Sequence, residues 1–367
     1  MMKLTDLEWK EFSFTDIFEI KKGFYNKKPN RTVGANIPFL GATDSNNGVT
    51  NFLTLSVIEK SSKTGKLPNE PLERKLFPGH AIAVTNNGSV GHAYYQAREF
   101  TCSHDINPLY LKDHTMSKLE ALFLIPLIEQ QGKLFQYARK WRPSRMVSSK
   151  IMLPVDDKDQ PDYQFMADYE KNLIHHKQEQ YLTYVKQQLS SLGDPINLEQ
   201  LIDKKWAPFF LNEVFDVNSG VRLTNQDKEN GKKPFIGATD NGNGITGFVG
   251  NTNKSQDSNV LGVNYNGAPG IAFYHPYTAL FSDDVKRLKL KDESHNTKNV
   301  LLFMASIVMK QRGKYSYGYK FNASRMNRQK LYLPVDNQGQ PDFDYMEQYI
   351  KNKMIQKYKK YLEYLGK

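Results

Sequence analysis

The chain carries the stretch PFLGATDSNNGVTNF at residues 38–52 and repeats it as PFIGATDNGNGITGF at residues 234–248. Ten of these 15 aligned positions are identical. A second block, residues 140–169, returns 180 residues later at residues 320–349 with 14 of 30 positions identical. This separation is the size of a domain and far exceeds the roughly 20–50 residues of a solenoid repeat. The sequence therefore predicts two tandem copies of one domain.

Length and charge narrow the class of protein. With 367 residues, the chain is long enough for two domains that each bury a core. Lys and Arg number 50 against 39 Asp and Glu, which gives a formal net charge of +11. Such a surplus favours a polyanionic partner, first a nucleic acid and second an anionic membrane surface, although basic enzymes are also common.

Cysteine content and hydropathy indicate the cellular compartment in which the protein is expected. A single cysteine, Cys102, excludes a disulfide within the chain and fits a reducing cytosol. The second copy has Phe281 at the matching position, so we expect Cys102 to fill space in a core rather than act as a nucleophile. The N-terminus has no apolar run typical of a signal peptide, and the longest apolar runs, 121–128 and 300–309, are too short to span a bilayer. We therefore expect a soluble cytoplasmic protein.

Both copies show the same order of predicted elements. A Trp-led opening passes through a helical turn into a strand, and two strands joined by an Asn-Gly turn follow, because Asn and Gly tolerate positive φ. An alternating strand, an amphipathic helix, a Leu-Pro-Val-Asp strand and a terminal helix complete the copy. Mixed strands and helices without regular β-α alternation indicate the α+β class. The ranges are 9–23 and 206–220 for the opening, 81–95 and 260–274 for the hairpin, 109–111 and 288–290 for the alternating strand, and 118–130 and 299–310 for the helix.

The terminal helices set the predicted boundaries, which are 1–161 for the first domain, 162–192 for its helix, 193–341 for the second domain and 342–367 for its helix. Residues 190–195 are predicted to form the linker between the two copies. Apolar residues three and four apart mark one face of each helix over about 20–25 residues, so the helices either pair with each other or dock on their own domains. Both helices carry Tyr-Leu-x-Tyr, and we predict that these tyrosines bind a partner: Tyr181, Tyr184, Tyr361 and Tyr364.

Catalytic motifs are missing from the sequence. It contains no Walker motif and no dinucleotide fingerprint, and its histidines lack the spacing of metal ligands. The acid-x-Lys patterns at 156–158 and 203–205 occur in many nucleases but lack a preceding acidic residue on a paired strand. We therefore predict a chain that catalyses nothing alone, with a self-sufficient nuclease as the alternative.

Binding residues, in contrast, recur in both copies. The pattern Lys, aromatic, two variable residues, Ser-Arg-Met occurs at 140–146 and 320–326. A Ser at a helix N-cap beside fixed cations suits phosphate oxygens, because free backbone N–H groups converge there. The alternative is that each Ser merely caps a helix with the Arg exposed. Together with the asparagines of the two hairpin turns, the predicted DNA-binding residues are Lys140, Arg142, Ser144, Arg145, Lys320, Ser324, Arg325, Asn87 and Asn266.

Segments that fail to align between the copies are the candidates for sequence specificity. Two copies that read different bases should diverge where they read them, so the near-identical Gly-Ala-Thr-Asp stretch favours a structural turn over base contacts. The divergent segments are 24–36 and 53–77 in the first copy and 221–232 and 250–258 in the second. They are polar and basic, which fits either DNA reading or plain surface loops.

A Trp-led opening at Trp9 and Trp206, two tandem α+β repeats, and a Leu-Pro-Val strand that runs into an amphipathic helix together resemble the specificity subunit of type I restriction-modification systems. The resemblance covers essentially the whole chain. It implies that each repeat is a target-recognition domain that reads half of a bipartite double-stranded DNA sequence. It also implies that the two helices pair as an antiparallel coiled coil and dock DNA methyltransferase subunits.

The same resemblance assigns the chemistry to partners. The methyltransferase subunits supply S-adenosylmethionine and flip adenine, a separate restriction subunit cleaves, and this chain holds no cofactor of its own. The short predicted helices favour the related specificity subunits of type IIB systems. An orphan antirestriction decoy, which binds methyltransferase subunits without DNA, remains the other alternative.

Overall fold

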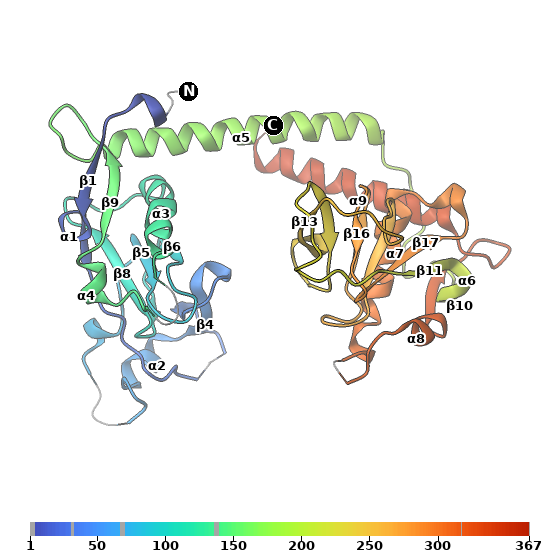
Figure 1. Ribbon diagram of the computed structural model, residues 1–367, viewed down its shortest axis with the longest axis horizontal. Coiled ribbons are helices and arrows are strands. Elements are labelled where there is room, and N and C mark those ends of the chain that lie inside the picture. The colour runs from blue at the N-terminus through green and yellow to red at the C-terminus, as the bar shows by residue number, and fades with distance from the viewer. Residues whose placement is uncertain (1–3, 31–32, 67–69, 136–138, 317, 367) are drawn as a thin grey trace. The chain divides into compact units, whose positions relative to one another are not determined.

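The computed structural model describes residues 4–30, 33–66, 70–135, 139–316 and 318–366. The chain divides into two compact units, Met1–Tyr181 (unit 1) and Leu182–Lys367 (unit 2). Each unit contains both helices and sheets, so the predicted α+β class is confirmed (Figure 1). No helix among the described residues is long and apolar enough to cross a membrane.

Unit 1 is built on a four-stranded antiparallel sheet in the order β2-β8-β5-β6. A three-stranded sheet, β4-β3-β7, and a two-stranded ribbon, β1-β9, complete the strands. Helix α3 contacts β5, β6 and β9 and closes the core over the larger sheet. The bounds are β1 Trp9–Ser13, α1 Phe14–Ile17, β2 Phe18–Ile20, β3 Ile37–Leu40, β4 Val49–Leu53, α2 Leu55–Lys60, β5 Ala81–Thr85, β6 Ala93–Gln96, β7 Thr101–Cys102, β8 Ile106–Leu111, α3 Lys118–Gly132, α4 Pro143–Met146, β9 Lys150–Pro154 and α5 Tyr163–Leu192.

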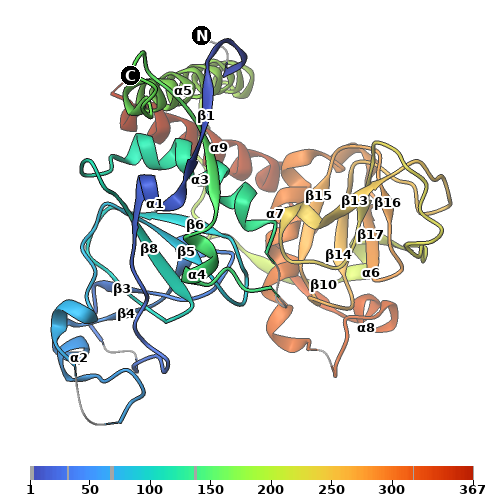
Figure 2. The same cartoon turned by 60° about the vertical axis from the view of Figure 1, so that its left-hand side comes forward.

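Unit 2 repeats this arrangement, as Figure 2 shows for its sheets, except that no helix corresponds to α2 in the described stretch between β13 and β14. Its larger sheet has the order β11-β17-β14-β15, its smaller sheet β13-β12-β16, and its ribbon β10-β18. Helix α7 takes the place of α3. The bounds are β10 Trp206–Phe210, α6 Leu211–Val214, β11 Phe215–Ser219, β12 Lys233–Ile236, β13 Ile245–Val249, β14 Val260–Asn264, β15 Ala272–His275, β16 Leu280–Phe281, β17 Val285–Leu290, α7 Lys298–Lys310, α8 Ala323–Asn327, β18 Lys330–Pro334 and α9 Phe343–Tyr364.

Cys102 illustrates how closely the two frames agree. It pairs with Leu40 in parallel, and Phe281 pairs with Ile236 in the same register. Its side chain is fully buried, and burial raises the pKa of the thiol well above its usual range. The predicted role as a buried filler is therefore confirmed.

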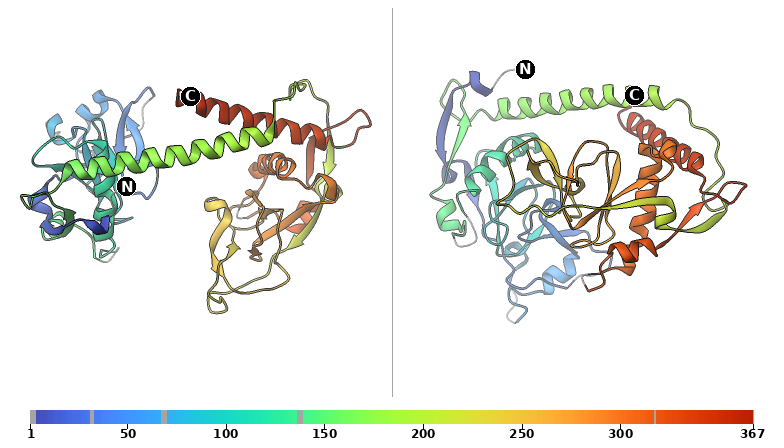
Figure 3. Two further views of the ribbon diagram at one scale, coloured as in Figure 1. Left: turned by 90° about the horizontal axis from the view of Figure 1, so that it is seen from above. Right: turned by 45° about the vertical axis from the view of Figure 1, so that its right-hand side comes forward.

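The terminal helices differ from expectation in length. Helix α5 has 30 residues and α9 has 22, or about 45 and 33 Å at the α-helical rise. The bounds of α5, Tyr163–Leu192, agree with the predicted range 162–192, whereas the 20–25 residues estimated from the apolar face were too few for this helix. Figure 3 shows α5 as one unbroken green helix. It extends into the first residues of the predicted linker and ends at Leu192, and the next residue, Gly193, has a φ of +72°, which disfavours residues with a side chain.

Within unit 2, the end of α5 runs antiparallel to α9. The hydroxyls of Tyr184 and Tyr358 lie 3.4 Å apart, and further along the chain Ile196 N donates to Asn352 Oδ1 at 3.1 Å. Helix α9 also docks on its own domain, because Glu347 accepts hydrogen bonds from Asn299 of α7 and from Thr297. The two alternatives predicted for this helix thus occur together.

Candidate nucleic-acid interface

In unit 1, the two segments that do not align with the second copy lie against each other. The backbone N–H groups of Asn26 and Lys27 both donate to Lys63 O, at 3.0 and 3.3 Å. Tyr25 adds a hydrogen bond from its hydroxyl to Ile58 O at 3.4 Å. The described parts of segments 24–36 and 53–77 therefore contact each other, although they are separate in the sequence.

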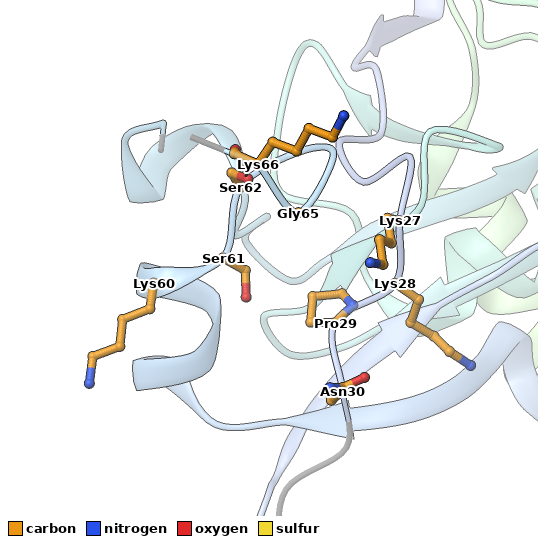
Figure 4. Close-up of a pocket in the computed structure, with 9 residues that line it drawn as sticks. All are labelled: Lys27, Lys28, Pro29, Asn30, Lys60, Ser61, Ser62, Gly65 and Lys66. Atoms are coloured by element: carbon orange, nitrogen blue, oxygen red, sulfur yellow. Dashed lines mark hydrogen bonds between the residues drawn. The ribbon is translucent and has the colours of Figure 1, made fainter. Parts of the chain in front are cut away.

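A hollow of about 320 Å³ lies between these segments, and we call it the lysine hollow. Figure 4 shows the side chains around it, with lysines from both segments on its rim. It is lined by Lys27, Lys28, Pro29, Asn30, Lys60, Ser61, Ser62, Gly65 and Lys66.

A buried lysine holds one wall of the lysine hollow in place. Lys75 is fully buried, and its Nζ donates to Glu59 O at 2.8 Å and to Ser61 O at 3.0 Å, at the end of α2. Burial lowers the pKa of its ammonium group. Thr101 anchors the same residue to the smaller sheet through a 2.7 Å hydrogen bond to Lys75 O. Sequence reasoning missed Lys75, because nothing in a polar loop distinguishes a buried lysine from an exposed one.

A second hollow, also of about 320 Å³, brings predicted DNA-binding residues together. Asn87, Lys140 and Arg142 line it, with Lys22 and Lys63 beside them. Lys63 also joins the two divergent segments through its backbone, so the second hollow adjoins the surface that carries the lysine hollow. The structure thus collects basic and amide side chains of unit 1 on neighbouring surfaces.

The predicted serine caps are wrong. Helix α4 has Arg142 as its N-cap, and α8 has Asn322, whose side chain accepts from Arg325 N at 3.0 Å. Ser144 and Ser324 occupy the second position of their helices, and both are exposed. Neither hydroxyl caps its helix, and contact of either serine with DNA stays a prediction.

The two arginines of the shared pattern bind their own loops. Arg145 Nη1 donates to Lys140 O at 2.7 Å, and Arg325 Nη1 donates to Lys320 O at 2.6 Å. Arg325 also lies over the Tyr319 ring at 3.6 Å. Arg145 is exposed and Arg325 half-buried, so each guanidinium both closes a loop and keeps a solvent-accessible side.

Aromatic residues of the same pattern fasten the loop to the core. Trp141 is fully buried, stacks on Phe135 with 5.3 Å between ring centroids, and donates from Nε1 to Ser149 Oγ at 2.9 Å. Phe321 takes its place in unit 2 and stacks on Tyr315 at 4.2 Å. Core packing therefore explains the aromatic position of the repeat, while the exposed cations remain candidates for DNA contact.

In unit 2, the two divergent segments also meet. Gly250 N donates to Glu229 O at 2.8 Å, and Glu229 N donates to Asn251 Oδ1 at 2.9 Å. Asn251 Nδ2 in turn donates to Asp227 O at 3.0 Å. Both units thus present two divergent segments that contact each other on a shared frame.

The tyrosines predicted to bind a partner differ in exposure. Tyr364 is 83% exposed, Tyr181 and Tyr184 are 44% and 42% exposed, and Tyr361 is half-buried. Tyr184 contacts Tyr358 of α9, with 6.2 Å between the ring centroids.

Asp156 of the acid-x-Lys pattern at 156–158 accepts hydrogen bonds from the backbone of its own turn. Asp156 Oδ1 accepts from Lys158 N at 2.8 Å and from Gln160 N at 2.9 Å, which closes a turn and lowers the pKa of the carboxyl. Asp336 closes the matching turn in unit 2. Across the described ranges, no group of three or more His, Cys, Asp or Glu residues is arranged to hold a metal ion.

Comparison with known proteins identifies the family. The family model described as "Type I restriction modification DNA specificity domain" matches residues 6–183 and 203–364. The chain is 36% identical over 353 residues to "Type II restriction enzyme BgcI specificity subunit S.BcgI" of Heyndrickxia coagulans, which covers 95% of this chain and 96% of that protein. The chain therefore belongs to the type I restriction-modification DNA specificity family.

A solved structure shows the same fold. The S subunit of a type I restriction-modification system from M. genitalium aligns with a TM-score of 0.50 at 17% identity, over 100% of this chain and 95% of that one. With two matched domains in tandem, the protein is a specificity subunit of a restriction-modification system.

Proposed function

We propose that this chain is a non-catalytic subunit that reads a bipartite double-stranded DNA target, one half with each unit. The observation that carries the proposal is that each unit places two divergent segments in contact on a frame that the other unit repeats. A shared frame with different reading segments suits two different half-sites, because phosphate contacts position a protein and base contacts specify the sequence.

The non-catalytic role is supported by how the acidic residues are used. Asp156 and Asp336 both close turns, as described above. Cys102 is buried with a raised pKa, so its thiolate is not available as a nucleophile. These placements favour the non-catalytic role over the nuclease alternative.

Partners supply the remaining chemistry in this proposal. DNA methyltransferase subunits, which bind S-adenosylmethionine, dock on the α5 and α9 surfaces, and a restriction activity associates with them. The relative from Heyndrickxia coagulans is named as a subunit of a type II restriction enzyme, and its 36% identity over nearly the full length favours a type II system of that kind here. Tyr364, which is 83% exposed and the most exposed of the four helical tyrosines, is the aromatic residue proposed to contact the methyltransferase.

Co-purification with the methyltransferase encoded beside this chain, followed by mapping of adenine methylation on genomic DNA, tests the proposal. We expect a bipartite methylated motif that appears only when this chain is present. A stable complex without a motif would favour the antirestriction decoy, and nicking of DNA by the purified chain with a divalent metal would favour the nuclease.

A further inference from the structure

Divergent segments of the two units differ in charge. In unit 1, segments 24–36 and 53–77 carry eight Lys and Arg residues against three acids. In unit 2, segments 221–232 and 250–258 carry four against three. The net charge is therefore +5 in unit 1, or +4 without the buried Lys75, and +1 in unit 2. The surfaces that should approach DNA thus differ in their attraction for phosphate.

The lysines of the lysine hollow form no salt bridge to any described residue, although Glu59 and Glu70 belong to the same segment of the sequence. Lys27, Lys28, Lys60 and Lys66 are exposed, and none forms a salt bridge within 4.0 Å among the described residues. Uncompensated cations gathered on one surface repel each other, and a polyanion relieves that repulsion. Binding then releases the counterions of the polyanion, which makes it favourable at low salt.

The arrangement suits a chain of phosphates better than a single one. Figure 4 shows the ammonium groups of Lys27, Lys28, Lys60 and Lys66 spread around the hollow and pointing in different directions rather than at one point. A site for one phosphate would need its donors to converge. Spread cations instead match the regularly spaced charges of a nucleic-acid backbone.

Cations of unit 2 near its divergent segments are bound to the protein itself. Lys233 Nζ donates to Asn251 O, Thr252 Oγ1 and Gln256 Oε1, at 2.8, 3.1 and 2.6 Å. Lys228 lies over the Phe235 ring at 4.8 Å. Arg287 pairs with Asp257 at 2.8 Å and is almost fully buried. Lys228, Lys233 and Arg287 are thus engaged by the protein, and the cations of these segments that stay exposed are Arg222, Lys232 and Lys254.

We infer that the two units make different numbers of phosphate contacts with their half-sites. The lysine hollow of unit 1 contacts several successive phosphates, whereas the divergent segments of unit 2 contact few. The half-site under unit 1 thus carries most of the salt-dependent affinity, and the half-site under unit 2 depends more on contacts that salt does not screen. This inference rests on the proposed DNA-reading function and names the residues that give it affinity.

Two variants with equal charge change test the inference. The first replaces the hollow's lysines (Lys27→Gln, Lys28→Gln, Lys60→Gln and Lys66→Gln), and the second replaces Arg222→Gln, Lys228→Gln, Lys232→Gln and Lys254→Gln in unit 2. Each loses four positive charges, so any difference reports position and not net charge. The probe is a duplex that carries the methylated motif, bound by the complex of chain and methyltransferase between about 50 and 200 mM potassium chloride.

We expect the unit 1 variant to reduce the slope of log affinity against log salt by about 3 to 4, because each lost phosphate contact removes about 0.9. The unit 2 variant should reduce it by at most about 1. Equal reductions, or a larger one from the unit 2 variant, would overturn the inference while leaving the proposed function intact. Failure of the wild-type complex to bind any duplex would overturn both.

All eight substituted side chains are exposed except Lys228, which is half-buried, so both variants should fold. A double variant of Lys27→Gln and Lys66→Gln provides a milder check, with an expected slope reduction of about 2. Replacing the same two residues by arginine should leave the slope unchanged. A reduced slope in that arginine variant would show that shape rather than charge was lost, and would count against the inference.

Discussion

Asn87 Nδ2 donates a hydrogen bond to Asp105 Oδ1 at 2.8 Å, and Asn266 repeats this bond to Asp284 at 2.9 Å in unit 2. The bond ties the turn after β5 to the residue just before β8. A contact that is identical in two units with different reading segments belongs to their common frame. The amide donor of Asn87 is therefore engaged before DNA arrives, while its role in DNA contact stays a prediction.

The first prediction concerns this pair. Asn87→Ala and Asp105→Ala should each lower the free energy of unfolding of unit 1 by about 1–2 kcal/mol, because each removes a partially buried hydrogen bond to a carboxylate. The double variant should cost less than the sum, with a coupling of about 1 kcal/mol. Urea unfolding of the four proteins measures the coupling. Strictly additive costs would show that the bond contributes nothing.

A second prediction concerns the glycine of the repeated Gly-Ala-Thr-Asp stretch. A Cβ on Gly41 would lie 2.9 Å from Thr50 Cγ2, and one on Gly237 would lie 2.8 Å from Thr246 Cγ2. Gly41→Ala should therefore destabilise unit 1 by about 1–3 kcal/mol through overpacking. Thermal unfolding measures the loss.

Matched variants separate crowding from the general effect of replacing glycine. Adding Thr50→Ala to Gly41→Ala should recover part of the loss, because the crowding methyl is gone. Gly247→Ala should be nearly neutral, since a Cβ there meets nothing within 4 Å. If Gly41→Ala left the thermal stability unchanged, crowding against Thr50 would not be the reason for a glycine at this position.

Repetition made much of this fold predictable. The hairpins, the alternating strands and the helices that became α3 and α7 were found because each appears twice with the same apolar pattern. The bounds of α5 were predicted to within a residue, but its apolar face alone indicated a shorter helix, because the polar stretch between Ile174 and Tyr181 shows no apolar face. Its long side chains are good helix formers, and the helix continues through them with most of them exposed.

The site was predictable in part. Lys140, Arg142 and Asn87, which were each predicted to bind DNA, line one hollow, and their DNA contact stays a prediction. The cap at Ser144 was misread, although Pro143 signals the first helical position and so places the cap at Arg142. The meeting of segments 24–36 and 53–77 could not be predicted, because it depends on backbone hydrogen bonds between residues distant in sequence.

The third prediction separates a structural role of Arg145 from a role in DNA binding. Its guanidinium donates a hydrogen bond to Lys140 O, and the side chain is also exposed to solvent. Arg145→Ala should weaken binding to every DNA sequence and lower the salt slope by about 1. Arg145→Lys should keep the slope but lose thermal stability, because an ammonium cannot reproduce the guanidinium geometry. Footprint titrations at two salt concentrations measure both. Unchanged affinity in Arg145→Ala would remove this residue from the DNA contacts.

A fourth prediction concerns docking of the methyltransferase. Tyr364 is 83% exposed, so Tyr364→Ala should leave the unfolding midpoint unchanged and weaken the complex about tenfold or more, as loss of an interface aromatic does. Lys360→Ala, an exposed position on the same helix, is the matched control and should have little effect. Calorimetric titration with the methyltransferase compares the three proteins. Equal affinities would place the docking surface elsewhere.

The last prediction concerns the pH dependence of unit 2. Burial lowers the pKa of His275 from its ordinary value to about 4, and its Nε2 has no hydrogen-bond partner among the described residues. The unfolded chain takes up this proton near pH 6.5 and the folded chain only near pH 4, so stability should fall as the pH drops between these values, by up to about 3 kcal/mol. His275→Gln should flatten that dependence, because Gln96 fills the equivalent position in unit 1 and donates to Asn47 O at 3.1 Å. Urea unfolding of unit 2 at about pH 7 and about pH 4.5 compares the two proteins. An equal loss of stability in both would assign the acid sensitivity to other groups.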